Sequence, residues 1–181
     1  MSVTSLVVRP VRVEHHADPL GIGQAQPRLT WSVVTEVEGW SQSGYELEIA
    51  RPDGSVRDTT GRVDSAESVL VAWPGAPLTS RERVAVRVRV WSSDAGAGAG
   101  GAGAAGKQSA PSGWSEPVWV EAGLLRAEDW VAAAVAPDPS LTGDPDGPAP
   151  LLRRDFTLDG EIASARLYVT SSWAISAMRS P

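Results

Sequence analysis

The stretch Arg83-Val-Ala-Val-Arg-Val-Arg-Val-Trp91 decides the fold class, because apolar and polar side chains alternate along it with a period of two. Successive side chains of a β-strand point to opposite faces, so the four valines share one face and the three arginines share the other. One apolar and one charged face are typical of an antiparallel sheet that covers a core on one side and meets solvent on the other. The stretch therefore predicts a long strand of such a sheet.

Shorter strand patterns lie on both sides of this stretch. They span Leu6 to Val13, Leu29 to Val33, Tyr45 to Ile49, Val56 to Thr59, Ser68 to Ala72 and Val118 to Glu121. Asp53-Gly54 after Pro52 is typical of a tight hairpin turn, and Pro74 to Pro77 breaks the chain before the long strand. Seven short strands with turns between them predict an all-β domain over residues 5–123, a β-sandwich of the fibronectin type III or immunoglobulin kind.

The pattern changes after the sandwich. Residues 124–150 predict a short helix from Leu124 to Val135, followed by a linker rich in Pro, Asp and Gly. Two further strand patterns, Leu151 to Leu158 and Ile162 to Thr170, predict the first strands of a second β-domain over residues 151–181. We expect no room for this domain to be completed within the chain. Two strands are not stable by themselves.

Composition excludes several classes of partner. The formal net charge is −6 and no basic stripe is present, so we expect no nucleic-acid partner. The absence of cysteine excludes disulfides and thiolate metal sites. We find no secretory signal and no apolar run long enough to span a membrane, and we expect a cytoplasmic protein without a membrane partner.

No constellation of catalytic residues is visible. Glu128 and Asp129 are adjacent, so their side chains diverge, and both are expected as acids in the first turn of a helix. His15 and His16 would point to opposite faces of a strand and could not readily bind one metal. Residues 95–106 contain only Ala and Gly and are expected to form a surface loop, not a nucleotide site. We therefore predict no catalytic residue, metal ligand or cofactor site.

Tryptophan is the aromatic residue that could carry binding, with eight copies in the chain. Most are expected in the core, and Trp31, Trp91, Trp114 and Trp119 are expected to pack against the sandwich or the neighbouring domain. Trp40 and Trp73 lie beside turn residues and are the two candidates for a sugar-stacking surface.

Several phrases resemble, in order, the N-terminal region of bacterial α-L-rhamnosidases. They are Asp18-Pro-Leu-Gly-Ile22, Pro27-Arg-Leu-Thr-Trp31, Gln42-Ser-Gly-Tyr45, Pro77-Leu-Thr-Ser-Arg81, Gly113-Trp-Ser-Glu-Pro117 and Glu121-Ala-Gly-Leu-Leu125. The next domain of that family begins with phrases similar to Pro150-Leu-Leu-Arg153 and Ala163 to Thr170, and it is jelly-roll-like. After Thr170 the resemblance ends, which favours a truncation or a shifted reading frame.

The resemblance implies a function that differs from that of the whole enzyme. Enzymes of this family are inverting glycosidases that remove terminal α-L-rhamnosyl residues from glycosides, with two carboxylates in an (α/α)-barrel far C-terminal to this region. The chain is thus expected to be a non-catalytic accessory fragment that meets rhamnose-containing glycosides only through its parent enzyme. The alternative is a free-standing carbohydrate-binding or interaction module that uses exposed tryptophans.

Overall fold

The computed structural model describes residues 6–93, 110–135, 153–157 and 159–170. The chain divides into two compact units, Met1–Asp129 and Trp130–Pro181. The Ala/Gly stretch 95–106, the Pro-rich stretch 137–150 and the tail after Thr170 lie outside the described residues. No helix in the described part is long and apolar enough to cross a membrane.

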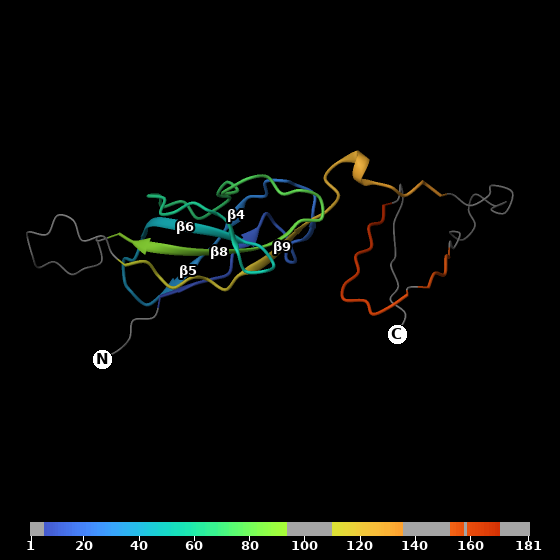
Figure 1. Cartoon of the computed structure of the whole chain (residues 1–181). Helices are drawn as coiled ribbons and strands as arrows, with labels where there is room; N and C mark the ends of the chain where they lie inside the picture. Colours follow the sequence, from blue (N-terminus) through green and yellow to red (C-terminus); the bar gives the residue numbers. More distant parts are fainter. Residues whose placement is uncertain (1–5, 94–109, 136–152, 158, 171–181) are drawn as a thin grey trace, which may run out of the picture. The chain divides into compact units, whose positions relative to one another are not determined.

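The first unit is all-β, as the alternating patterns predict. Its strands are β1 (Leu6–Val8), β2 (Arg12–Val13), β3 (Leu20–Ile22), β4 (Leu29–Thr30), β5 (Val33–Thr35), β6 (Gln42–Ala50), β7 (Val56–Thr59), β8 (Arg83–Ser92) and β9 (Val118–Ala122). Five of them form one sheet in the order β3-β9-β8-β6-β7, with the predicted long strand β8 at its centre (Figure 1). Pairs β1-β5 and β2-β4, both antiparallel, lie outside this sheet.

The hairpin between β6 and β7 has the predicted turn. Gly54 adopts a φ of 83°, a conformation that glycine reaches without strain. The Gly54 N–H donates to the carbonyl of Arg51, and the Ser55 N–H donates to the Asp53 carboxylate. The Asp-Gly signal therefore identified this turn correctly.

Several strand patterns differ from the observed strands, including Leu29 to Val33, which is divided into β4 and β5. The stretch Leu6 to Val13 is divided into β1 and β2 around Pro10, which has no N–H to donate to a ladder. Ser68 to Ala72 forms only an isolated bridge between Leu29 and Val71, and Leu70 leaves the β-region with a φ of 52°. Strand β3, which pairs in parallel with β9, has no alternating pattern and was missed.

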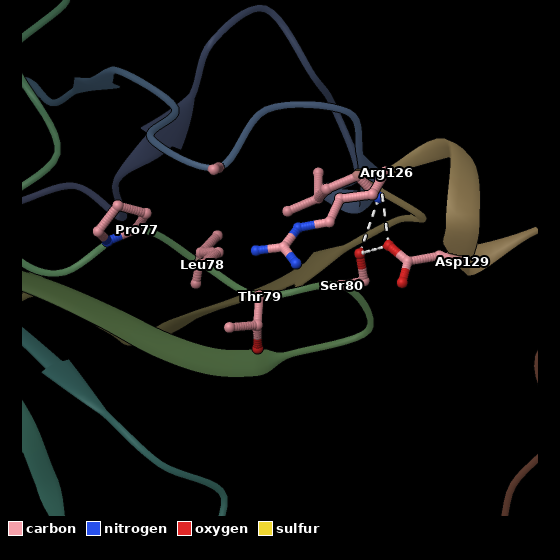
Figure 2. Close-up of a pocket in the computed structure, with 8 residues that line it drawn as sticks. Pro77, Leu78, Thr79, Ser80, Arg126 and Asp129 are labelled. Carbon is pink, nitrogen blue, oxygen red and sulfur yellow. Dashed lines mark hydrogen bonds between the residues drawn. The ribbon is translucent and has the colours of Figure 1, made fainter.

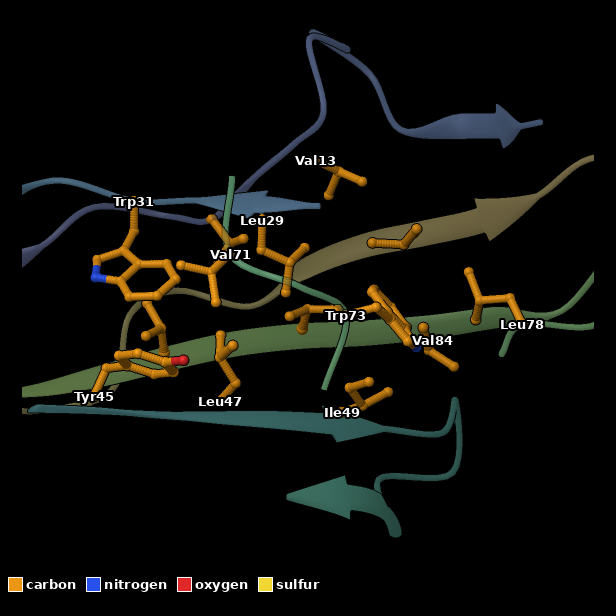
Figure 3. Packing of buried hydrophobic residues seen from close by; sticks show 14 of the residues in the cluster. Val13, Leu29, Trp31, Tyr45, Leu47, Ile49, Val71, Trp73, Leu78 and Val84 are labelled. Carbon is orange, nitrogen blue, oxygen red and sulfur yellow. The ribbon is translucent and has the colours of Figure 1, made fainter. Parts of the chain in front are cut away.

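The core fills the space between the sheet and the two strand pairs, where side chains from both point toward one another (Figure 3). The four valines of β8 are all buried, which confirms the face assigned to them. The large side chains packed with them include Leu29, Trp31, Leu47, Ile49 and Trp73. Trp31 and Tyr45 meet edge to face with ring centroids 5.0 Å apart.

The end of the chain is less regular than its pattern predicts. The expected helix from Leu124 to Val135 is reduced to one 3-10 turn, Ala127–Asp129. The Asp129 carboxylate accepts the N–H of Arg126, as an acid does in the first turn of a helix, but the helix does not continue beyond Asp129. No strand forms in residues 153–157 or 159–170, which corrects the two strand patterns there. A strand needs a hydrogen-bonded neighbour, and alternation alone does not supply one.

Replacing Leu47 by alanine is expected to lower the free energy of unfolding by about 2–5 kcal/mol, because the side chain is fully buried between the layers. Urea unfolding followed by far-UV circular dichroism measures this change. The matched control is Val56→Ala in the edge strand β7, whose side chain is exposed and whose loss should change stability little. Equal effects of the two substitutions would contradict the observed packing.

Candidate functional site

A hollow of about 480 Å³ lies where the chain leaves the sandwich (Figure 2). It is lined by Ala25, Pro77, Leu78, Thr79, Ser80, Leu125, Arg126 and Asp129. The Ser80 hydroxyl donates to the Asp129 carboxylate and accepts the Leu125 N–H at 2.8 Å. The Arg81 guanidinium donates to the Asp129 carbonyl at 3.3 Å. These bonds hold residues 124–129 against the turn that precedes β8.

The hydrogen bond from Ser80 lowers the pKa of Asp129 below its ordinary value of 3.8. The N–H of Arg126 and the nearby positive charges act in the same direction, while desolvation opposes them. Asp129, expected as an acid of a helix start, therefore serves as an ionised anchor. A single carboxylate in this state is suited to holding a segment in place rather than to transferring protons.

The two tryptophans predicted for sugar stacking lie in different surroundings. Trp73 is only 7% exposed and belongs to the core, and its indole N–H donates to the Ala76 carbonyl at 3.1 Å (Figure 3). Its ring is therefore covered by protein and is not open to a ligand, which corrects that prediction. Trp40 is partly buried against the core, and its indole nitrogen has no protein partner. For Trp40, sugar stacking stays a prediction.

The histidine pair lies in an exposed turn between β2 and β3. The buried acid beside it, Glu14, forms an ion pair with Arg28 at 2.8 Å and accepts the backbone N–H of Arg28 at 2.6 Å. The hydrogen bond from the Arg28 side chain lowers the pKa of Glu14 below its ordinary value. Within the described ranges, no group of three or more His, Asp or Glu side chains is placed to hold a metal ion.

The outer face of the five-stranded sheet carries a ladder of arginines and tryptophans. Arg89 lies 5.4 Å from the ring centre of Trp91 and 4.6 Å from that of Trp114. Arg87 lies 4.6 Å from the same Trp114 ring. The two arginines also pair with glutamates of β6, Arg89 with Glu46 at 2.6 Å and Arg87 with Glu48 at 2.7 Å. The charged face predicted to meet solvent is thus partly covered by aromatic rings.

Trp119, predicted to pack against the sandwich or the neighbouring domain, is one of two exposed tryptophans among the described residues. Its side chain is 42% exposed on the outer face of β9, and the guanidinium of Arg83 lies 4.5 Å from its ring centre. The signal was present in the sequence, since Trp119 precedes the fully buried Val120 and a period of two places neighbours on opposite faces. A groove of about 240 Å³ begins at this indole. Its walls are formed by Glu48, Ala50, Arg51, Pro52, Gly54, Ala85, Arg87, Pro117 and Trp119.

Replacing Trp73 by alanine should destabilise the fold by about 3–5 kcal/mol, because a large buried ring and its hydrogen bond are removed. Thermal unfolding measures the loss. Trp130→Ala is a suitable control, because that ring is 38% exposed and its removal leaves no cavity in the sandwich core. A normal melting temperature for the Trp73 variant would place the ring outside the core.

Ser80→Ala is expected to raise the pKa of Asp129 toward 3.8 and to speed hydrogen exchange at the Leu125 amide, because both lose the same hydroxyl. Since the pKa of Asp129 is depressed in the folded chain, its anchoring is complete above pH 3.8 and is lost as the pH falls through the lowered value. Carboxylate titration by NMR and amide exchange measure the two effects. Thr79→Val, which removes a neighbouring hydroxyl bonded to Glu82, should change neither. An unshifted Asp129 titration in the Ser80 variant would disprove the anchoring role.

Comparison with known proteins gives a consistent result. The family described as "Rha78A-like, N-terminal immunoglobulin domain" matches residues 8–100. The α-L-rhamnosidase of Streptomyces avermitilis is 31% identical over 192 residues, which cover 93% of this chain and 17% of the relative. That of Alteromonas sp. is 28% identical over 173 residues, which cover 87% of this chain and 17% of the relative.

Solved structures agree with the sequence matches. The Streptomyces avermitilis α-L-rhamnosidase complexed with L-rhamnose has a TM-score of 0.64 and 33% identity, over 76% of this chain and 12% of that one. The Aspergillus terreus enzyme has a TM-score of 0.58 and 40% identity, over 71% of this chain and 13% of that one. The chain spans 17% of the length of the curated relatives named above. On these matches, the chain belongs to the α-L-rhamnosidase family and corresponds to its N-terminal, immunoglobulin-like region.

Proposed function

We propose that this chain is a non-catalytic accessory module of an α-L-rhamnosidase, an enzyme that hydrolyses terminal α-L-rhamnosyl residues of glycosides. The observation that carries the proposal is the family match to the N-terminal immunoglobulin domain, over a chain that spans only 17% of the matched enzymes. The reaction and its rhamnose-containing substrates are thus assigned to the parent enzyme.

The arrangement of carboxylates supports a non-catalytic role. Most glycosidases use two carboxyl groups that face each other across the scissile bond, about 6.5–9.5 Å apart for inversion and about 5–5.5 Å apart for retention. The hollow where the chain leaves the sandwich contains one carboxylate, Asp129, which is hydrogen-bonded to Ser80. The groove beside Trp119 also contains one, Glu48, which is paired with Arg87. Neither site provides an opposed acid and base.

The hydrogen bonds of Ser80 to the segment 125–129 suggest what such a module does. The Ser80–Asp129 and Ser80–Leu125 bonds attach the end of the first unit to the turn before β8. A segment held at its start has fewer accessible conformations than a free linker, which lowers the entropy lost when neighbouring parts pack. The module would therefore support the rest of the parent enzyme by holding the start of the connecting segment.

Incubation of the purified chain with 4-nitrophenyl α-L-rhamnopyranoside should release no nitrophenol above the blank, because neither of the two hollows compared above offers the sugar a pair of opposed carboxylates. Absorbance at alkaline pH measures the product, and the full-length Streptomyces avermitilis enzyme is the positive control. Turnover that follows the chain through successive columns and is abolished by Glu48→Gln or Asp129→Asn would overturn the proposal.

A further inference from the structure

The groove beside Trp119 is built from two neighbouring rows of the five-stranded sheet. In the first row, Trp119 of β9 pairs with Ala85 of β8, which in turn pairs with Ala50 of β6. Two alanines beside a tryptophan leave a notch in the sheet face, because small side chains cannot fill the height of the indole. The neighbouring row contains the ion pair of Arg87 and Glu48.

The positions of the arginines leave one side of the indole to the groove. On β8, Arg83 and Arg87 lie on either side of Ala85 and project from the same face. Arg83 lies over the Trp119 ring and is not among the groove's lining residues, whereas Arg87 lines the groove. Arg87 directs its guanidinium to Trp114 and to Glu48. The ladder of alternating arginines and tryptophans is thus interrupted by open space between Arg87 and Trp119.

The charged residues of the groove include one ion pair, which favours an uncharged ligand. Glu48 neutralises Arg87 at 2.7 Å, and Arg51 interacts electrostatically with Asp53 of the adjoining turn. A phosphate or carboxylate group at Arg87 would meet a guanidinium already paired with Glu48 and would lie beside the Glu48 carboxylate, which repels it. A neutral polyol, by contrast, can donate hydrogen bonds to the Glu48 carboxylate and accept them from the guanidinium groups.

The size of the groove limits the ligand to about one ring. Its volume of about 240 Å³ lies just below the range of about 300–1,000 Å³ typical of sites for drug-sized ligands. A protein partner would need a contact of about 800 Å² on each side to form a stable complex, which is far more than this groove offers.

From these observations we propose that the groove is a saccharide-binding subsite, in which the apolar face of one uncharged pyranose ring stacks on Trp119. The ring's hydroxyl groups are hydrogen-bonded by Arg87, Glu48 and Arg51, and the alanines of β6 and β8 form the floor. Only the choice of a rhamnoside as test ligand rests on the proposed function, since the groove's chemistry defines the class of ligand by itself.

The test is a titration of the whole chain with methyl α-L-rhamnopyranoside, followed by NMR of the indole N–H resonances. One shallow contact with a monosaccharide should give a dissociation constant on the order of 1 mM, with the largest shift at the Trp119 indole. Trp119→Ala should weaken binding about tenfold or more. Because the Trp119 side chain is 42% exposed, the variant is expected to fold, and circular dichroism checks this.

A second variant tests the groove without removing the indole. Ala85→Leu fills the floor beside Trp119 and should abolish saccharide binding while the strand is retained. Trp130→Ala is the matched control, because that tryptophan is similarly exposed, at 38%, and lies outside the groove. It should leave the dissociation constant unchanged.

Either of two results would overturn the subsite. The first is the absence of a saturable shift in the unaltered chain up to about 100 mM sugar, a concentration far above the expected dissociation constant. The second is equal binding by the Trp119 and Ala85 variants and the unaltered chain. Both results leave the accessory role intact, since that role is tested separately by the nitrophenyl rhamnoside assay.

Discussion

The antiparallel ladder between β6 and β8 is the constraint on which the rest of the structure depends. It runs from the Gln42–Ser92 pair to the Ala50–Ala85 pair and sets the register of both long strands. Because side chains alternate along a strand, this one register directs the valines of β8 into the core and its arginines to the outer face. A slip of one residue would exchange the two faces and remove both the core and the arginine ladder.

The same register creates the outer surface. It places Arg87 opposite Glu48 and Arg89 opposite Glu46, so each guanidinium has a carboxylate on the neighbouring strand. Trp91 of β8 and Trp114 of the segment before β9 then pack on these arginines. Trp119 of β9 packs on Arg83. Ala85 and Ala50 lie in the same row of the sheet as Trp119. Their small side chains leave this part of the outer face uncovered, and the groove forms there. The groove is thus a consequence of strand pairing as much as of its own residues.

Four carboxylates of the sandwich form contacts that hold strands and turns together. Glu14 joins the turn after β2 to Arg28, just before β4. Glu46 and Glu48 fix the arginines of β8, and Asp129 ties the end of the unit to Ser80. A glycosidase instead requires two carboxyl groups held apart and facing one sugar. This use of the four acids agrees with the accessory role proposed above.

The sequence by itself determined the all-β class, the face of each residue on the long strand and the Asp-Gly hairpin, because alternation and turn chemistry are local properties. The family was indicated separately, by the resemblance of phrases such as Pro27 to Trp31 and Gly113 to Pro117. The sequence could not reveal that β3 pairs in parallel with β9, that Leu70 interrupts a strand pattern, or that Trp73 lies in the core. The tertiary structure decided these points. Burial and pairing depend on residues distant in the chain, and a tryptophan beside a turn has the same local signature whether or not another layer covers it.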